Sequence, residues 1–218
     1  FMKKVLALII GVLLIYLVYY LQKPYVYSSV DQISEINPLI LVNSENAFPD
    51  NVNLNLVSFN GYQVADTIYN DLAHMYNAAL NDNITLKINN AYRSKDEQTQ
   101  IFESKMNAYE NEGYTKEKAY EQTTLTVQVP GYSEHETGLA IDFSNEGHYD
   151  ENEKMWEWLK NNAYKYGFIL RYPEDKYEIT KINYEPWHYR YVGKKAAKDI
   201  TNKNLTLEEY LGGNVWTY

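Results

Sequence analysis

The chain begins with an uncharged apolar run and continues with segments in which apolar and polar residues alternate at regular periods. The apolar run from Val5 to Leu21 follows Lys3 and Lys4. At about 1.5 Å per helical residue, a run of this length predicts a short membrane-spanning helix. Lysines on its N-terminal side predict that the remaining chain faces outward. The end of the run lacks the small residues of a signal-peptide cleavage site, so we expect an uncleaved anchor in the cell membrane, with secretion after cleavage as the alternative.

Residues 23–59 differ from the rest of the chain in composition. They are rich in Asn, Ser and Pro and contain only short apolar clusters. Such a composition predicts a linker with an edge strand that leads away from the membrane. We therefore divide the chain into a signal anchor over 1–22, a linker and edge segment over 23–59, and one globular domain over 60–218. About 160 residues are enough to bury an independent hydrophobic core.

The expected globular domain mixes helical and strand periods without a regular order. Apolar residues three or four positions apart predict a helix over 62–80, and alternation predicts a strand over 84–92. Ser94 and Glu97 match a capping box, which predicts a helix to about Asn107. The other expected elements are helices over 116–126, 151–162, 194–201 and 207–211, and strands over 138–143, 166–170 and 187–192. Because no regular βαβ alternation occurs, we expect an α+β fold with a central antiparallel sheet and flanking helices.

Composition and charge exclude several classes of function. The 218 residues include no Cys, and 29 Asp and Glu outnumber 20 Lys and Arg to give a net charge of −9. Without cysteine there are no disulfides, thiolate metal sites or cysteine nucleophiles, so ligands and nucleophiles must carry oxygen or nitrogen. An acidic domain without a basic run matches a polyphosphate poorly, so we expect no nucleic-acid partner. We expect a monomer.

Two of the four histidines lie in surroundings that suit a metal site. His135 precedes Asp142 by seven positions, and His188 follows later in an aromatic stretch. Two imidazoles and one carboxylate leave the fourth position of tetrahedral zinc open for water, as in catalytic zinc sites. Asp142 lies in an otherwise apolar strand, where a metal ion would compensate for its burial. An exposed pair of His135 and Asp142 is the alternative. We expect a surface or packing role for His74 and an exposed loop position for His148, with a place lining the cleft as the alternative for His148.

Two further residues have the chemistry of catalytic groups. Glu185 stands three positions before His188, where a carboxylate could exchange a proton with water. The alternative for Glu185 is a surface ion pair with Arg171 or Arg190. Arg93 follows the strand expected over residues 84–92, and its guanidinium can hold a substrate carboxylate or a developing oxyanion with two hydrogen bonds. An ordinary surface charge is the alternative for Arg93.

Four blocks of the sequence resemble the VanY-type D-alanyl-D-alanine carboxypeptidases, zinc peptidases related to VanX, lysostaphin-like enzymes and Hedgehog-type domains. The blocks are AYRSKDEQ at 91–98, PGYSEHETGLAIDF at 130–143, NAYKYGFILRYP at 162–173 and YEPWHYRYVG at 184–193. They follow one another in the order typical of the family. The resemblance implies a carboxypeptidase that removes the C-terminal D-Ala from peptidoglycan stem peptides, on the family's α+β fold.

The same resemblance implies roles for individual residues. It implies one Zn(II) ion held by His135, Asp142 and His188. It implies Glu185 as the catalytic base, and it implies that Arg93, with Gln98 and Ser133, binds substrate. Arg93 would also stabilise the oxyanion.

Other functions remain open from the sequence. An L,D-carboxypeptidase that trims tetrapeptide stems would have the same motifs, and a peptidoglycan endopeptidase is a third enzymatic possibility. A module that binds peptidoglycan without cutting it is the main non-enzymatic alternative. The iron(II) facial triad also uses two His and one carboxylate. Those oxygenases have an H-x-D motif, with one residue between the His and the Asp, on a β-rich fold. Here six residues separate His135 from Asp142.

Overall fold

A four-stranded antiparallel sheet carries the residues of the expected site. The computed structural model describes residues 36–212 of the chain. The strand order is β3 (Ile88–Asn90), β4 (Ala140–Phe143), β6 (His188–Tyr191) and β5 (Phe168–Leu170). In the central pair, Asp142 on β4 lies opposite His188 on β6. The expected α+β fold with an antiparallel sheet and flanking helices is confirmed.

The two faces of the sheet have different characters because successive strand residues point to opposite sides. Ile141, Phe143, Tyr189 and Tyr191 belong to the main hydrophobic core. The core also contains the buried sides of α2 (Asp66–Asn81) and α5 (Tyr149–Asn162). The intervening residues of β4 and β6, among them Asp142 and His188, are therefore left for the other face.

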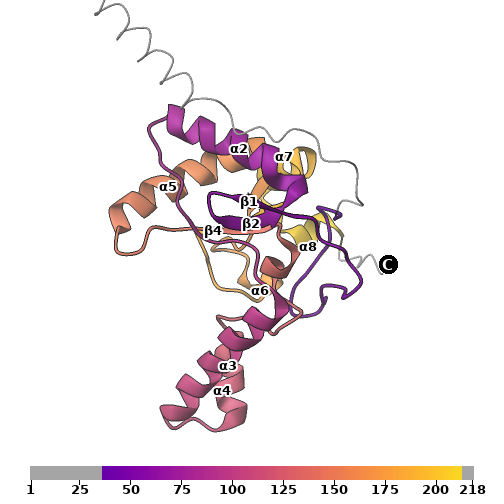
Figure 1. The fold of residues 1–218 in the computed structure, drawn as a ribbon, viewed down its shortest axis with the longest axis vertical. Helices are drawn as coiled ribbons and strands as arrows, with labels where there is room; N and C mark the ends of the chain where they lie inside the picture. Colours follow the sequence, from indigo (N-terminus) through magenta and orange to yellow (C-terminus); the bar gives the residue numbers. More distant parts are fainter. Residues whose placement is uncertain (1–35, 213–218) are drawn as a thin grey trace, which may run out of the picture.

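The remaining helices surround this sheet or project from it. Figure 1 shows α2, α5 and α7 gathered at one end of the molecule, and the α3–α4 hairpin projecting from the opposite end. The bounds are α3 Lys95–Asn111, α4 Lys116–Thr124, α6 Tyr177–Thr180, α7 Lys194–Asn202 and α8 Leu207–Tyr210. Two short 3-10 helices, η1 (Glu134–Thr137) and η2 (Ala163–Tyr166), precede β4 and β5.

The helix expected over residues 62–80 starts later than its apolar spacing suggests. Tyr62–Ala65 forms β2, which pairs antiparallel with β1 (Leu56–Phe59), and α2 begins only at Asp66. The turn is Asn60-Gly61, with positive φ angles of 50° and 89°. Asn-Gly is the favoured pair for a two-residue hairpin turn. Local turn chemistry therefore overrides the helical spacing, but only over the first four residues of the segment.

Most other expected elements are present with shifted ends. The capping box at Ser94 is confirmed, because its hydroxyl accepts from the Glu97 amide and the Glu97 carboxylate accepts from the Ser94 amide. The helix that it opens continues four residues beyond the expected end, to Asn111. The strand expected over 84–92 is reduced to β3, whose pairing with β4 is irregular.

Residues 36–59, the described part of the expected linker, pack against the domain. Ile36, Ile40, Val42 and Phe59 are buried members of the main core. The division of the chain at residue 59 stays a prediction, and these contacts favour a boundary nearer the N-terminus. The anchor expected over 5–21 lies outside the described residues. Within residues 36–212, none of the helices has both the length and the apolar character needed to cross a membrane.

Gly138 joins η1 to β4 at a point where the chain is crowded, and its replacement should be costly. Its φ is +68°, and an added Cβ would lie 2.8 Å from the backbone nitrogen of Ala65. That nitrogen donates to the Gly138 carbonyl at 3.0 Å. Gly138→Ala should therefore lower the free energy of unfolding more than Gly61→Ala, measured by urea denaturation. Gly61 has φ +89° but no atoms within 4 Å of its Cβ position, so it carries only the left-handed backbone cost of about 1–2 kcal/mol. If both variants lost the same free energy of unfolding, the close approach of Gly138 to Ala65 would not contribute to stability.

Candidate active site

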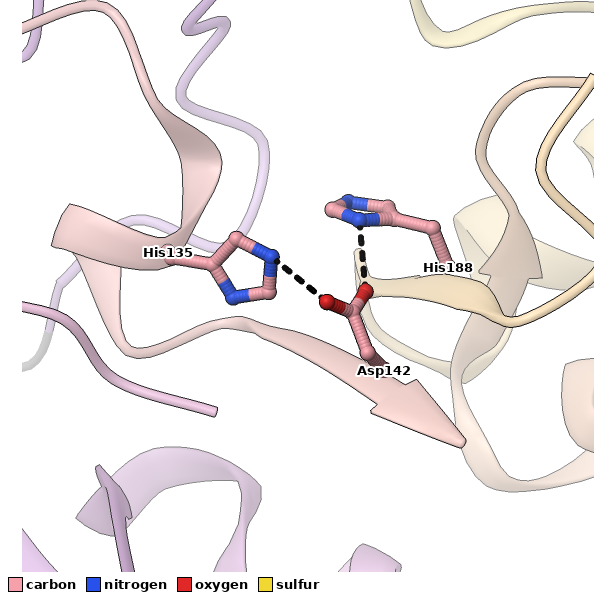
Figure 2. Close-up of side chains that lie close together, drawn as sticks. All are labelled: His135, Asp142 and His188. Carbon is pink, nitrogen blue, oxygen red and sulfur yellow. Dashed lines mark ion pairs between the residues drawn. The ribbon is translucent and has the colours of Figure 1, made fainter. Parts of the chain in front are cut away.

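Three elements bring two imidazoles and one carboxylate together. His135 lies on η1, Asp142 on β4 and His188 on β6. Figure 2 shows the Asp142 carboxylate between the two imidazole rings, with one oxygen toward each. His135 Nε2 is 3.2 Å from Asp142 Oδ2, and His188 Nδ1 is 2.9 Å from Asp142 Oδ1. One ligand atom from each residue lies within 4.8 Å of the others, so the structure brings together the expected metal-binding residues.

The backbone and one amide fix the orientation of His135 and Asp142. His135 Nδ1 lies 2.7 Å from the carbonyl oxygen of Ala91. A carbonyl only accepts hydrogen bonds, so Nδ1 carries the proton and Nε2 presents its lone pair to the cluster. The Asn90 side-chain amide donates to Asp142 Oδ2 at 3.2 Å. Neither Asn90 nor Ala91 was expected from the sequence to take part in the site, although both lie just before Arg93.

One oxygen of Asp142 fits a metal ion better than it fits a purely protein environment. Oδ1 is buried and receives no hydrogen bond of good geometry within residues 36–212. Burial raises the pKa of Asp142, but the neighbouring His135 and His188 outweigh burial and hold it well below its usual value. An ionised, buried oxygen without a donor is costly unless a cation compensates for it. The donor set of two imidazoles and one carboxylate suits Zn(II) with an open position.

The cluster forms part of a cleft of about 240 Å³. Glu185 lines the same cleft, and its Oε2 is 3.8 Å from His188 Nδ1. Burial raises the pKa of Glu185, His188 lowers it, and Asp142 and Glu134 add smaller increases, so that the pKa lies at about 7. A carboxyl group that titrates near neutral pH can exchange protons during turnover. The ion pairs considered from the sequence, with Arg171 or Arg190, are not formed, because both arginines bind Glu134 instead.

Arg93, Gln98 and Ser133 also line the cleft. The Arg93 amide donates to the His135 carbonyl at 3.1 Å, which ties the arginine to the metal cluster. Its guanidinium donates to Gln98 Oε1 at 2.7 Å, and Gln98 Nε2 donates to the Gln128 carbonyl at 2.6 Å. The Gln98 side chain therefore holds Arg93 in place. Substrate binding by Arg93, Gln98 and Ser133 stays a prediction.

The remaining two histidines lie apart from the cleft. The His74 side chain is 51% exposed and lies near Asp71 on the same helix. The His148 side chain is 57% exposed at the start of α5, near Glu151. Both positions agree with the surface location expected from the sequence.

Behind the metal cluster lies a buried ionic network that was not expected from the sequence. Glu134 Oε1 accepts from Arg171 Nε at 2.8 Å and from an Arg190 guanidinium nitrogen at 2.7 Å. Arg171 also binds both carboxylate oxygens of Glu208 on α8, at 2.7 and 2.9 Å. His188 Nε2 lies 3.3 Å from Glu134 Oε2. In the sequence, Glu134 and Arg190 are charged residues within two positions of an expected ligand, but Arg171 and Glu208 lie far from any ligand, so the pairing depends on the fold.

Comparison with known proteins agrees with this geometry. The VanY family of D-alanyl-D-alanine carboxypeptidases matches residues 61–194, which is more than half of the chain. The chain belongs to the VanY family. Membership confirms the resemblance of the four sequence blocks, and all the metal-cluster residues lie inside the matched region.

Members of the VanY family and related solved structures cover most of this chain. A D-alanyl-D-alanine carboxypeptidase of Enterococcus faecalis is 40% identical over 174 residues, 79% of this chain and 65% of its own length. A mutant of the vancomycin resistance D,D-pentapeptidase VanY, solved in complex with Zn(II), is 40% identical with a TM-score of 0.74. This comparison covers 80% of this chain and 98% of that structure. The LdcB LD-carboxypeptidase has 37% identity and a TM-score of 0.68, covering 85% and 92%. The chain spans 50% to 65% of the length of four curated relatives.

The ion pair between Arg171 and Glu208 should make stability depend on pH in the acid range. Burial raises the pKa of Glu208, but Arg171 outweighs it, so the folded-state pKa lies below the ordinary value of 4.5. The stabilisation is therefore present above about pH 4.5 and is lost as pH falls through the folded-state pKa.

Glu208→Gln should lower the free energy of unfolding at pH 7 by about 1–3 kcal/mol. The difference from wild type should shrink below pH 4.5, measured by urea denaturation at each pH. Glu178→Gln is a matched control, because its carboxylate forms only an exposed ion pair with Lys181. If Glu208→Gln lowered the free energy of unfolding by the same amount at pH 7 and below pH 4.5, the charge of Glu208 would not contribute to stability.

Proposed function

We propose that this chain is a zinc-dependent D-alanyl-D-alanine carboxypeptidase that removes the C-terminal D-Ala from peptidoglycan stem peptides. The observation that carries the proposal is the cluster of His135, Asp142 and His188 in a cleft that Glu185 and Arg93 also line. The family match, the name of the Enterococcus faecalis relative and the Zn(II) complex of a VanY structure support the same activity.

Zinc held by His135, Asp142 and His188 would supply a Lewis acid that activates water and polarises a carbonyl group. Glu185 takes the proton from the attacking water and returns it to the nitrogen of the departing D-Ala. A pKa of about 7 suits both steps, because the carboxyl group can gain and lose a proton at neutral pH. No covalent link between this chain and the peptide is needed.

Arg93 provides the positive charge on the substrate side of the cleft. Its guanidinium is held by Gln98 and can donate to the oxygen that becomes negative as the peptide bond breaks, or to the C-terminal carboxylate. Loss of one such donor lowers turnover by about 10²–10³-fold in other hydrolases.

The anchor and the location of the domain are part of the proposal. Stem peptides of the cell wall lie outside the membrane, so the proposed substrate fits a single-pass protein with its domain outward, or a secreted form. We expect a monomer to be sufficient, because the residues of the cleft come from one chain. Proteolysis of intact cells tests the topology: a domain that resists added protease in intact cells and is cut only after lysis would contradict it.

Two substitutions separate the proposed base from the proposed ligands. Glu185→Ala should keep zinc and the fold but lower kcat by about 10²–10⁴-fold, because general acid–base catalysis contributes that amount. His188→Ala should lose zinc as well as activity. Bound metal is measured by mass spectrometry of metals after dialysis, and turnover by release of alanine. Near wild-type turnover of Glu185→Ala would falsify the assignment of the base.

The products decide between the two carboxypeptidase activities. The zinc-loaded full chain is incubated with stem pentapeptide and, in a parallel reaction, with stem tetrapeptide. The masses of the products are measured by mass spectrometry. Loss of one alanine from the pentapeptide alone is the expected result. Cleavage of the tetrapeptide alone would favour L,D-carboxypeptidase activity, for which the similarity to LdcB is the supporting observation. Zinc binding without cleavage of either peptide would contradict both activities and favour an endopeptidase or a binding module.

A further inference from the structure

His188 is flanked by carboxylates on both of its ring nitrogens. Nδ1 faces Asp142 Oδ1 at 2.9 Å and lies within the metal cluster, as Figure 2 shows. Nε2 lies 3.3 Å from Glu134 Oε2, on the side away from Asp142. The Tyr172 ring packs beside the imidazole, with 4.9 Å between ring centroids. These neighbours therefore set the orientation of the His188 imidazole. Whether Nε2 carries a proton depends on whether Glu134 acts as an acceptor or as a donor.

Glu134 is held as an acceptor by two arginines. Its other oxygen, Oε1, accepts from Arg171 at 2.8 Å and from Arg190 at 2.7 Å. Guanidinium groups only donate, and their positive charges favour the ionised form of the carboxyl group. Glu134 Oε2 therefore faces His188 Nε2 as an acceptor. When a metal ion occupies the Nδ1 side, the one ring proton of His188 lies on Nε2 and can donate to this oxygen.

We infer that Glu134 is a positioning residue that keeps the proton of His188 on Nε2 and thereby directs the Nδ1 lone pair at the metal. The inference rests on the proposed function, because it assumes that His188 is a metal ligand. Ligating histidines in general donate their second ring N–H to an oxygen acceptor, which fixes the tautomer.

The surroundings of Glu134 make this arrangement rigid. The side chains of Arg171 and Arg190 are 0% exposed and that of Glu134 is 1% exposed. A second Arg190 nitrogen donates to the carbonyls of Pro38 and Ile40, at 3.1 and 2.7 Å. The carboxylate therefore has little freedom to turn away from His188.

The same rigidity predicts what an amide would do at this position. In Glu134→Gln, the two arginines would attract the amide oxygen, because they can only donate. The amide NH₂ would then face His188 Nε2, which would have to accept. This favours the tautomer with its proton on Nδ1, which cannot bind a metal through that atom.

The test compares Glu134→Gln with Glu136→Gln in the full chain. Glu136 is a buried glutamate on the same turn, and its carboxylate accepts from the Gly131 amide at 2.8 Å, a bond that an amide oxygen can also accept. Zn(II) affinity is measured by competition with a chromophoric chelator. We expect Glu134→Gln to bind Zn(II) about 10–100-fold more weakly than wild type. Glu136→Gln should bind as wild type does, and circular dichroism should show both variants folded.

A second measurement needs no variant, so it remains decisive if Glu134→Gln does not fold. The ring nitrogens of ¹⁵N-histidine in the zinc-loaded wild-type chain distinguish metal-bound from protonated nitrogen by their chemical shifts. For His188 we expect a protonated Nε2 and a metal-bound Nδ1. A zinc-bound Nε2 would overturn the inference, as would unchanged affinity in a folded Glu134→Gln variant, and in both cases the proposed function would stand. If the wild-type chain bound no zinc, both the inference and the proposed function would fail.

Discussion

The structure around the cleft depends on one buried ionic network. Glu134, Arg171 and Arg190 are almost completely removed from solvent, and isolated charges in that position would be very costly. Two arginines need a second carboxylate for neutrality, and Glu208 provides it from α8. A buried ion pair is weak evidence for added stability, because desolvation offsets much of the attraction. Its effect here is positional, since each partner must occupy one place for the charges to be compensated.

That positional constraint connects distant parts of the chain to the metal cluster. Arg190 lies on β6 two residues after His188, and it binds the carbonyls of Pro38 and Ile40 near the start of the described chain. Arg171 connects the end of β5 to α8. Glu134 directly precedes His135, so both histidines of the cluster are adjacent to the network in sequence or in space. The segment at residues 36–42 and the helix α8 thus act as structural supports of the cleft, although neither carries a residue of the cluster.

The sequence predicted the parts of this arrangement that depend on local signals. Capping, apolar spacing and the four blocks of family resemblance were enough to predict the α3 start, the α+β class and the residues that meet in the cluster. The helix expected over 62–80 was wrong at its start because an Asn-Gly turn pairs β2 with β1. The role of Glu134 was not accessible, because its partners lie 37 and 56 positions away in the sequence. Pairing over such separations is decided by the fold and not by neighbouring residues.

Two glutamates beside His188 show how the fold gives the same side chain different chemistry. Glu134 is buried between two arginines, which outweigh burial and lower its pKa far below the usual value. Glu185 is only partly buried and has no such partner, and its pKa is raised to about 7. Environments that separate the pKa values of two carboxyl groups also separate their roles. The first glutamate keeps its charge and serves as a fixed acceptor, whereas the second can exchange protons in the cleft. A catalytic carboxyl group therefore cannot be identified from its distance to a ligand alone, because both glutamates lie within 4 Å of His188.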